Sequence, residues 1–498
     1  MIYSQICKFY NNRNVFVTGG TGFVGTVLIE KLLRSTNVAK IYVLIRPKNG
    51  KDANTRLDEM FDSEFYTKLK SEKPDFKNRL IAISGDCNLP NLGLSVANHE
   101  RLIVDVDIVF HGAASTQFTE NIKRAYTNNV RNTANLLTFC KQLRRLKSLV
   151  HVSTAFTNFI FDSIDEVFYD YNIDYEQIEE VLSKEMSSSE ADKLTSSIIR
   201  GWPNTYVFTK AWSEAVIKNN AGNLPIGIFR PGIVISTYRE PLQYWTNRLS
   251  GPASIAASAS LGIYQVHLTK RSEVFAELVP ADMSVAALIA IAWDVGSAYE
   301  TGCKEIPIYN YISSKDNSIT WNEFAQLNAL QFWIYPLKNA SWVPNFTAVY
   351  HFWEYKFLFL IFHYCPAIIM DIIRVISLRK PKMISLYKKI DNLYDALYPF
   401  VRTSFKFSNN NTKSLWNKLN QVDKELFPFD ISQVNWLIYF RNYQKGLRLY
   451  LHKDPLETLP EAKIRMERFE ILQKVMIYTV YLIGIISIFV TLSNIFVY

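Results

Sequence analysis

Short apolar runs alternate with amphipathic helical segments over roughly residues 14–201. The runs are apolar along their whole length, which is typical of strands buried on both faces. The helical segments between them, one of them at residues 22–34, predict helices on both faces of a parallel sheet. We therefore expect a doubly wound α/β fold. The predicted strands are residues 15–18, 41–45, 80–84, 107–111 and 148–153, with a further strand at 225–235 and a long helix between the fourth and fifth strands.

The pattern changes twice after this region. Residues 350–364 hold eight aromatic side chains, and beyond about residue 380 the charge density rises and helical periods dominate as far as Lys474. We expect four parts in linear order. They are a doubly wound domain at residues 1–270, a substrate-binding and aromatic-rich region at 271–380, a helical domain at 381–474 and a terminal apolar segment at 475–498.

The terminal segment has 24 residues without a charge. As a helix it would cross roughly 30 Å of hydrocarbon, whereas a buried core helix would keep one polar face, so we expect a transmembrane anchor. Four basic residues precede it, which places the body of the chain in the cytosol; they are Lys463, Arg465, Arg468 and Lys474. We expect no secretory signal peptide. The endoplasmic reticulum membrane is the expected location, and the peroxisomal membrane is the alternative.

A second apolar stretch covers residues 357–370. Fourteen residues that include His363 and Pro366 are short for a membrane span. The stretch is equally compatible with a position at a membrane interface and with the lining of an apolar channel.

Composition narrows the choice of partners. The chain has 498 residues, of which 48% are apolar and 20% charged, as in ordinary globular proteins. Its net charge of +9 favours anionic partners such as phosphate groups or acidic lipids. Nucleic acid is not expected, because no basic tract, aromatic RNA-binding signature or zinc-ligand spacing accompanies the charge, and no metal site is predicted. The five scattered cysteines indicate reduced thiols and no disulfide framework. The sequence leaves the oligomeric state open.

A glycine-rich loop joins the first predicted strand to the first helix. Glycines at 19, 22 and 25 allow a tight turn, close approach of a pyrophosphate and close packing of the helix on the sheet. Because strand, loop and helix occur in the required order, we predict a dinucleotide-binding site rather than a helix cap built of glycines. The residues are Thr18, Gly19, Gly20, Thr21, Gly22, Phe23, Val24 and Gly25.

Residues at the ends of the next strands refine this prediction. Arg46, with Lys48 nearby, stands where an NAD-dependent enzyme would often carry a carboxylate for the ribose 2′-hydroxyl. A guanidinium binds a 2′-phosphate that a carboxylate would repel, so NADPH is the expected cofactor unless Arg46 is simply solvated. Asp86 could accept a hydrogen bond from the adenine amino group. Ala113 and Ala114 offer small side chains where a cofactor must pass close to the backbone.

Tyr206 and Lys210 place a phenol and an ammonium on one face of a predicted helix. The cation would lower the pKa of the phenol and make it a better proton donor to a carbonyl oxygen as hydride arrives. The same ammonium could bind the nicotinamide ribose. The spacing alone is common, but here it follows a strand that ends in Ser153 and Thr154. We expect the hydroxyl of Thr154, or alternatively that of Ser153, to share the carbonyl oxygen with Tyr206.

Together these residues resemble the extended short-chain dehydrogenases/reductases, and within that superfamily an alcohol-forming fatty acyl-CoA reductase. The resemblance runs nearly from end to end of the chain. It implies that Thr154, Tyr206 and Lys210 are catalytic, that Asn129 supports the site from its helix, and that Pro231 borders the cofactor. The matching stretches include residues 18–25, 27–34, 44–47, 151–155, 203–206, 229–231, 398–400, 405–411 and 427–430.

The resemblance also implies a reaction. It is the NADPH-dependent reduction of long-chain fatty acyl-CoA to fatty alcohol through an aldehyde, with release of CoA, next to membrane lipid. The chain departs from the family's usual residues at Asn132, Phe156 and Gly232, and at residues 240–245, where substrate should bind. Two alternatives stay open. One is a membrane-bound extended reductase acting on a sterol or a nucleotide sugar, and the other is a non-catalytic NADPH-binding scaffold.

Overall fold

The structure, a computed structural model, describes residues 3–249, 251–270 and 273–496. Its contacts divide the chain into two compact units. The first unit consists of Met1–Thr246, Glu273–Thr320 and Asp395–Asn435, and the second of Asn247–Ser272, Trp321–Tyr394 and Trp436–Tyr498. The units interleave along the chain, which differs from the linear division expected from the sequence. The expected boundary between residues 270 and 271 falls at the edge of the described ranges, because residues 271–272 lie outside them.

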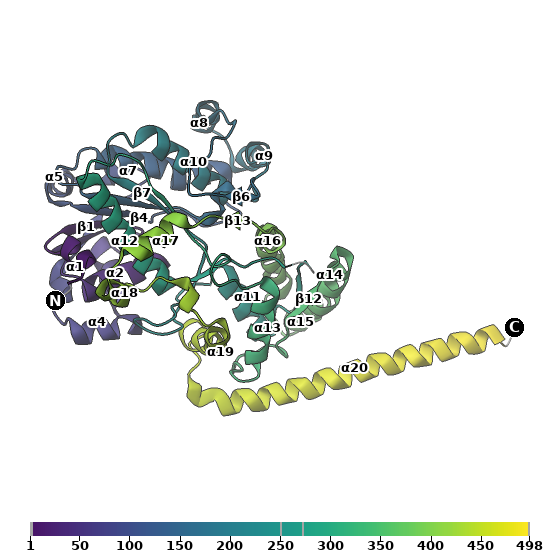
Figure 1. The fold of residues 1–498 in the computed structure, drawn as a ribbon. Helices are drawn as coiled ribbons and strands as arrows, with labels where there is room; N and C mark the ends of the chain where they lie inside the picture. Colours follow the sequence, from purple (N-terminus) through teal and green to yellow (C-terminus); the bar gives the residue numbers. More distant parts are fainter. Residues whose placement is uncertain (1–2, 250, 271–272, 497–498) are drawn as a thin grey trace. The chain divides into compact units, whose positions relative to one another are not determined.

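A seven-stranded parallel sheet forms the centre of the first unit and confirms the predicted fold class (Figure 1). The strands are β1 (Asn14–Thr18), β2 (Lys40–Ile45), β3 (Leu80–Ser84), β4 (Ile108–His111), β5 (Ser148–Val152), β7 (Ile226–Pro231) and β11 (Ile308–Tyr311). Their order is β3-β2-β1-β4-β5-β7-β11. The order reverses between β1 and β4, and ligands of doubly wound sheets bind at such a switch point, outside the carboxyl ends of the strands.

Helices cover both faces of this sheet (Figure 1). On one face, α2 (Phe23–Ser35) packs against α12 (Ala281–Glu300), and on the other α7 (Asn132–Cys140) packs against α10 (Thr205–Asn220). By length and composition α12 could cross a membrane, but 78% of its apolar window is buried, and it contacts β5 and β7. Its apolar character therefore belongs to the core of the first unit.

The strand expected at residues 225–235 is wrong as a single element. The chain leaves the main sheet after β7, and β8 (Ile233–Ile235) pairs with β10 (Leu278–Pro280) in a separate two-stranded sheet. The change occurs at Gly232, where a Cβ would lie 2.3 Å from the carbonyl oxygen of Glu277. The sequence pattern also missed β11, which pairs with β7 at the edge of the sheet. This strand explains why Glu273–Thr320 belongs to the first unit.

Residues 395–435 belong to the first unit. Among their contacts there, strand β13 (Lys406–Phe407) pairs with β6 (Ser163–Ile164), and α17 (Asn410–Lys418) packs on β11. The shorter elements of this unit are α1 (Gln5–Tyr10), α3 (Ala53–Phe61), η1 (Glu64–Tyr66), α4 (Thr67–Glu72), η2 (Phe76–Arg79), η3 (Pro90–Gly93), α5 (Val96–Asp105), α6 (Ile122–Ala125), η4 (Tyr126–Arg131), η5 (Ala155–Asn158), β6 (Ser163–Ile164), α8 (Tyr175–Ser183), α9 (Ser188–Ile198), β13 (Lys406–Phe407), α17 (Asn410–Lys418), α18 (Gln421–Leu426) and η7 (Ile431–Gln433).

The second unit is mainly helical, as is the region from residue 381 to residue 474, where helices were predicted. Its elements are α11 (Gly251–Ser260), β9 (Val266–Leu268), α13 (Trp321–Phe332), β12 (Thr347–Val349), α14 (Phe352–Phe359), η6 (Leu360–Tyr364), α15 (Cys365–Ile376), α19 (Trp436–Gly446), η8 (Leu447–Leu451), η9 (Leu456–Thr458) and α20 (Leu459–Phe496), with α16 (Met383–Arg402) running from the second unit into the first.

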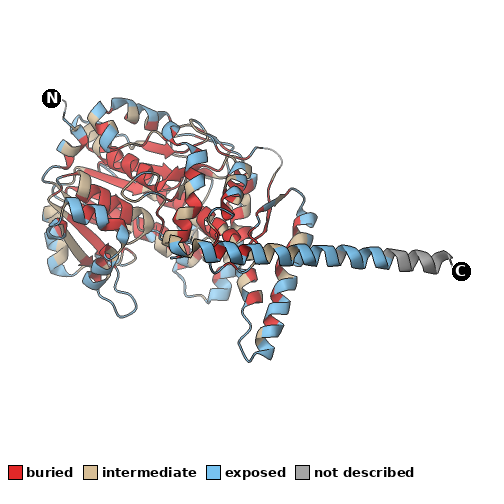
Figure 2. Ribbon diagram, turned by 90° about the horizontal axis from the view of Figure 1, so that it is seen from below, coloured by how far each residue is buried: buried red, intermediate tan, exposed pale blue. Residues whose placement is uncertain are grey.

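Helix α20 carries the apolar segment expected to form an anchor. It is one continuous helix. Its first turns include the buried Ala462 and Met466, whereas the apolar stretch beyond them has no buried residue among those described (Figure 2). By length and composition it is a candidate membrane span. The last two residues of the expected anchor, 497 and 498, lie outside the described residues.

Candidate active site

The glycine-rich loop lies between β1 and α2, at the switch point of the sheet. Gly19 has a φ of 74°, and a Cβ there would lie 2.6 Å from the carbonyl carbon of Gly112. A Cβ on Gly25 would lie 2.3 Å from the carbonyl oxygen of Gly19. Both positions therefore require glycine. Gly22 is the N-cap of α2, so the first N–H groups of that helix face the loop, as in sites that bind phosphate groups.

The other side chains of the loop pack on the protein. A Cβ on Gly20 would lie 2.5 Å from the side chain of Val43, and Thr21 and Val24 are half-buried. The ring of Phe23 stacks on Trp245 with centroids 5.8 Å apart. The backbone of the loop, rather than these side chains, is thus what the loop offers to a ligand.

Small residues border the loop at the end of β4. Thr18 Oγ1 accepts a hydrogen bond from the N–H of Ala113 at 3.3 Å and lies 2.8 Å from His111 Nδ1, which joins the ends of β1 and β4. Gly112 and Ala114 are exposed. The surface beside the loop therefore leaves the backbone accessible.

Arg46 and Asp86, predicted to contact different parts of the cofactor, lie together. Arg46 Nη1 is 3.8 Å from Asp86 Oδ2, and the Arg46 side chain is 62% exposed. An exposed ion pair of this kind contributes little to the stability of the fold, so the Arg46 guanidinium is available to another anion. Arg56, on α3, donates a hydrogen bond to the carbonyl oxygen of Arg46 and adds a second guanidinium that the sequence analysis missed.

Tyr206 lies in the first turn of α10 and is half-buried. The side chain of Asn204 caps this helix by accepting a hydrogen bond from the N–H of Val207 at 3.0 Å. Burial raises the pKa of Tyr206 to about 12, although hydrogen bonding with the Thr154 side chain acts in the opposite direction. The phenol is therefore protonated at neutral pH and able to donate its proton.

Lys210 lies one turn further along α10 and is buried. Its ammonium donates a hydrogen bond to the carbonyl oxygen of Val152 at 2.7 Å and lies 3.0 Å from His151 Nε2. Burial lowers the pKa of Lys210 to about 7, with the charge of Glu214 acting against this shift. The prediction that Lys210 lowers the pKa of Tyr206 is wrong, because burial determines the direction of both shifts.

Two buried histidines adjoin Lys210, and the sequence analysis gave neither a role. The rings of His111 and His151 lie 5.1 Å apart. Burial lowers the pKa of His111 to about 3 and the pKa of His151 well below its usual value, and Lys210 acts in the same direction on both. Both rings are therefore neutral at neutral pH. Nε2 of His151 then accepts from the ammonium, and its Nδ1 has no partner among the described residues.

The structure separates the two candidate hydroxyls at the end of β5. Ser153 donates a hydrogen bond to Glu214 Oε1 at 2.5 Å, and Glu214 forms a buried ion pair with Arg230, also at 2.5 Å. Thr154 is the residue whose side chain interacts with Tyr206. This arrangement supports Thr154 as the hydroxyl near the reacting oxygen and gives Ser153 a structural role. Pro231, at the end of β7, follows Arg230 and is buried.

Asn129 links the site to the helix that precedes it. Its side-chain amide donates to Thr209 Oγ1 at 2.9 Å and to the carbonyl oxygen of Ser115 at 3.2 Å, and it accepts from the N–H of Ser115 at 2.8 Å. It lies in the π-helical turn η4, a distortion that is frequent at functional sites. Asn129 thus holds the loop after β4 against α10.

An aromatic cluster packs beside Tyr206 within the first unit. The ring of Phe118 lies 5.7 Å from that of Tyr206 and stacks on Phe400 at 5.8 Å. Phe156 and Phe159 contact the same Phe400 ring at 5.1 and 5.4 Å. In the sequence, Phe156 stands out only as a departure from the family's usual residue and residues 398–400 only as a matching stretch, because periodicity cannot bring together positions so far apart. The cluster gives the phenol an apolar neighbour.

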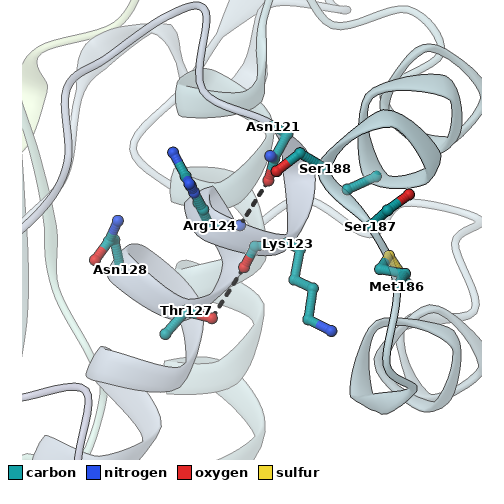
Figure 3. A pocket seen from close by; sticks show the side chains of 9 residues that line it. Asn121, Lys123, Arg124, Thr127, Asn128, Met186, Ser187 and Ser188 are labelled. Atoms are coloured by element: carbon teal, nitrogen blue, oxygen red, sulfur yellow. Dashed lines mark hydrogen bonds between the residues drawn. The ribbon is translucent and has the colours of Figure 1, made fainter.

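A polar pocket of about 360 Å³ opens between the start of α6 and the start of α9 (Figure 3). Asn128, which lines it, accepts a hydrogen bond at 3.0 Å from the side-chain amide of Asn88, on the loop after β3. It contains two cations, Lys123 and Arg124, and no acid is among the nine described residues that line it. The lining residues are Asn121, Lys123, Arg124, Thr127, Asn128, Met186, Ser187, Ser188 and Ala191.

Comparison with known proteins identifies the family. Two profiles described as male sterility protein match the chain, one over residues 17–288 and the other over residues 362–454. The chain is 41% identical to fatty acyl-CoA reductase wat from Drosophila melanogaster, over 94% of this chain and 90% of that protein. The chain belongs to the fatty acyl-CoA reductase family. Within this family it is also 33% identical to fatty acyl-CoA reductase 2 from Bos taurus, over 93% of this chain and 90% of that protein.

Solved structures give the same fold for this fatty acyl-CoA reductase family member. A reductase domain of a nonribosomal peptide synthetase from Mycobacterium tuberculosis superposes with a TM-score of 0.59 and 20% identity, over 89% of this chain and 95% of that chain. The terminal R domain from the myxalamid PKS-NRPS biosynthetic pathway gives a TM-score of 0.55 at 17% identity, over 88% of this chain and 91% of that chain. The family and the fold support an oxidoreductase with a nicotinamide cofactor. The loop fits such a cofactor, because Gly22 caps α2 without a side-chain hydrogen bond and leaves the first N–H groups of that helix to a phosphate.

Proposed function

We propose that this chain reduces long-chain fatty acyl-CoA to fatty alcohol with NADPH, in two steps through an aldehyde and with release of CoA. The observation that carries the proposal is the setting of Tyr206. Its protonated phenol interacts with Thr154, lies one helical turn from Lys210, and contacts the aromatic cluster. A proton donor beside an apolar wall suits a carbonyl group attached to a long acyl chain.

The bound nicotinamide would supply hydride to the carbonyl carbon. The backbone of the glycine-rich loop would hold its pyrophosphate, and Arg46, with Arg56 nearby, would bind the 2′-phosphate of NADPH. Lys210 uses two of its three N–H donors on Val152 and His151, which leaves the third for a ribose hydroxyl. These residues bind and orient the cofactor.

Tyr206 would donate its proton to the substrate oxygen while the hydroxyl of Thr154 holds that oxygen. In the first reduction the thioester carbon gains hydride and its oxygen gains the proton. The C–S bond then breaks while the new hydroxyl returns its proton to the Tyr206 phenolate, so that CoA leaves as the thiolate, an aldehyde remains and Tyr206 is protonated again. In the second reduction the aldehyde carbon would gain hydride from a second NADPH and its oxygen a proton from Tyr206, which yields the alcohol.

The polar pocket would take the phosphates of CoA. The loop that carries Phe118 leads directly to Asn121 and Lys123, so one stretch of chain borders both the aromatic cluster and the pocket. Two cations with no lining acid favour a phosphate group. The thioester of a CoA ester bound there would lie toward Tyr206.

We also propose that α20 anchors the protein in the endoplasmic reticulum membrane with the catalytic unit in the cytosol, the peroxisomal membrane being the alternative. The exposed apolar surface of α20 and the basic residues before it support this orientation. An acyl chain that partitions into lipid is then close to its enzyme.

The test of the function is a product assay with the full-length protein in lipid nanodiscs. Addition of long-chain acyl-CoA should consume NADPH and yield the fatty alcohol, identified by mass spectrometry, whereas sterols and nucleotide sugars should be inert. Binding of NADPH without its oxidation by any acyl-CoA would instead favour a scaffold.

A further inference from the structure

The segment formed by α14, η6 and α15 is one helix-like rod with a narrow buried stripe. It runs from residue 352 to residue 376, longer than the 14 residues expected from the sequence, and 22% of its apolar window is buried. Its buried residues follow one another at intervals of four. They are Tyr355, Phe359, His363, Ala367 and Asp371.

This stripe fixes the rod to the rest of the second unit. The carboxylate of Asp371 accepts hydrogen bonds from the N–H groups of Lys382, Met383 and Ile384 at 2.8, 2.9 and 3.0 Å, at the start of α16. His363 Nε2 accepts from the N–H of Gln265 at 3.0 Å. The Asp371 carboxylate and His363 Nε2 are therefore used inside the protein, and these bonds set which side of the rod faces outward.

The outward side is mainly apolar, with the exposed Glu354 at its start. Trp353 is 80% exposed, Phe357 61%, Ile369 58%, Ile376 77% and Leu378, just beyond the rod, 97%. Exposed apolar patches of this extent mark sites of contact with a partner or a membrane.

Basic residues surround the end of this face. Between residues 374 and 390 the sequence contains six cations and no acid. Arg379, Lys380 and Lys382 are exposed and flank Leu378. An apolar face bordered by cations is complementary to an anionic lipid leaflet, because the cations meet the headgroups where the apolar side chains meet the acyl chains.

The packing of α16 distinguishes a helix that lies on the membrane from one that crosses it. Asp371 caps α16, and Tyr355 stacks on Tyr394 with ring centroids 5.2 Å apart, so the rod and the first part of α16 stay together. Helix α16 carries Lys388 and Lys389, both exposed. If the rod crossed the bilayer, α16 would bring these charges into the hydrocarbon, which is costly.

We propose that the outward face of residues 352–378, the membrane-facing surface, lies flat in the interface of an anionic leaflet and does not cross the bilayer. The surface is then a second membrane contact besides α20. It holds the second unit against the leaflet from which a lipid substrate would come.

Two exposed cysteines make this testable in the full-length protein. Cys365 lies near the middle of the rod and is exposed, and Cys303, in the first unit, is exposed and serves as the matched control. Each is labelled alone with an environment-sensitive fluorophore, with the other and Cys7 replaced by serine. The labelled proteins are reconstituted in vesicles of phosphatidylcholine and phosphatidylserine that carry a quencher either near the headgroups or at the end of the acyl chains.

The two quencher positions separate the alternatives. A rod that lies flat predicts that the probe at Cys365 is quenched more by the shallow quencher than by the deep one, and that the probe at Cys303 is quenched by neither. Stronger quenching by the deep quencher would show a spanning helix, because residue 365 would then lie at mid-bilayer. No quenching at Cys365 would show that a protein surface or solvent covers this face. Either result overturns the proposal.

Charge variants test the choice of an anionic leaflet. Arg379→Glu and Lys380→Glu should each shift the Cys365 probe out of lipid contact, weakening the surface's lipid partition about fivefold for each cation lost. Lys218→Glu, on α10 in the first unit, is the control that changes net charge elsewhere. The assignment of anionic lipid would be contradicted if quenching of the Cys365 probe in the Arg379 and Lys380 variants, and in vesicles of phosphatidylcholine alone, equalled that of the wild-type protein in vesicles with phosphatidylserine.

Discussion

The pH dependence of the reaction follows from the burial of Lys210. Its pKa is lowered from 10.5 to about 7, whereas the pKa of Tyr206 is raised to about 12 and the two adjoining histidines stay neutral. Only Lys210, among these four groups, changes its protonation between pH 6 and 9. If the ammonium is the form that binds the cofactor ribose, kcat/KM for NADPH should be level below pH 7 and fall above it. From pH 7 to pH 9 the protonated fraction falls about 50-fold.

The assay is the initial rate of NADPH oxidation at limiting NADPH and saturating acyl-CoA, because kcat/KM reports the groups of the free enzyme. Lys210→Met should lower kcat/KM and abolish the descending limb. Lys218→Met is the matched control, because Lys218 is an exposed residue of the same helix that pairs with Asp170 at 2.5 Å. It should leave the profile unchanged. A wild-type profile that stays level to pH 9, or rises, would show that the ammonium form of Lys210 is not required for binding the cofactor.

Three further variants test other parts of the site. Arg46→Ala should raise the KM for NADPH by about 10- to 100-fold and leave the KM for NADH nearly unchanged, since it removes a charged hydrogen-bond donor to the 2′-phosphate; equal effects on both cofactors would exclude that role. Arg124→Ala should raise the KM for acyl-CoA about tenfold but not that for a fatty aldehyde, which lacks CoA; a change with both substrates would argue against a CoA pocket. Glu214→Gln should lower Tm, because it leaves the buried guanidinium of Arg230 without its partner, at a cost of about 3 kcal/mol; an unchanged melting curve would show that this pair is dispensable.

The central sheet could be predicted because its strands are buried on both faces. Five strands read as uninterrupted apolar runs, and the structure places all five within a residue or so of the expected bounds. Strand β11 was missed because it is short and contains Asn310, whose side chain donates to the carbonyl oxygens of Ile164 and Ser408. A buried amide satisfied by residues distant in the sequence carries no local signal.

The length of the rod at residues 352–376 was underestimated for a related reason. His363 and Pro366 look like interruptions, but His363 accepts a backbone hydrogen bond, and Pro366 lies in the first turn of α15, where proline is tolerated. The π-helical turn η6 lets the chain pass through both residues without ending the rod.

The candidate site was predictable in its residues but not in its contacts. Glycine spacing and the four-residue interval between Tyr206 and Lys210 are local features, so the sequence contains them. That interval places both residues on one face of a helix but does not fix where the Lys210 ammonium points. In the structure this ammonium bonds to His151 and Val152. The contact of Phe118 with Phe400 depends on how residues 395–435 pack in the first unit, which no local pattern contains.

Turnover of long-chain acyl-CoA by Tyr206→Phe tests whether this phenol is the proton donor. The substitution removes one hydroxyl and keeps the ring that packs on Phe118. We expect NADPH binding, followed by nucleotide fluorescence, to be nearly unchanged, while alcohol formation falls by about 100-fold or more. Alcohol formation at the wild-type rate by a variant that binds NADPH normally would contradict the claim that this phenol protonates the substrate oxygen.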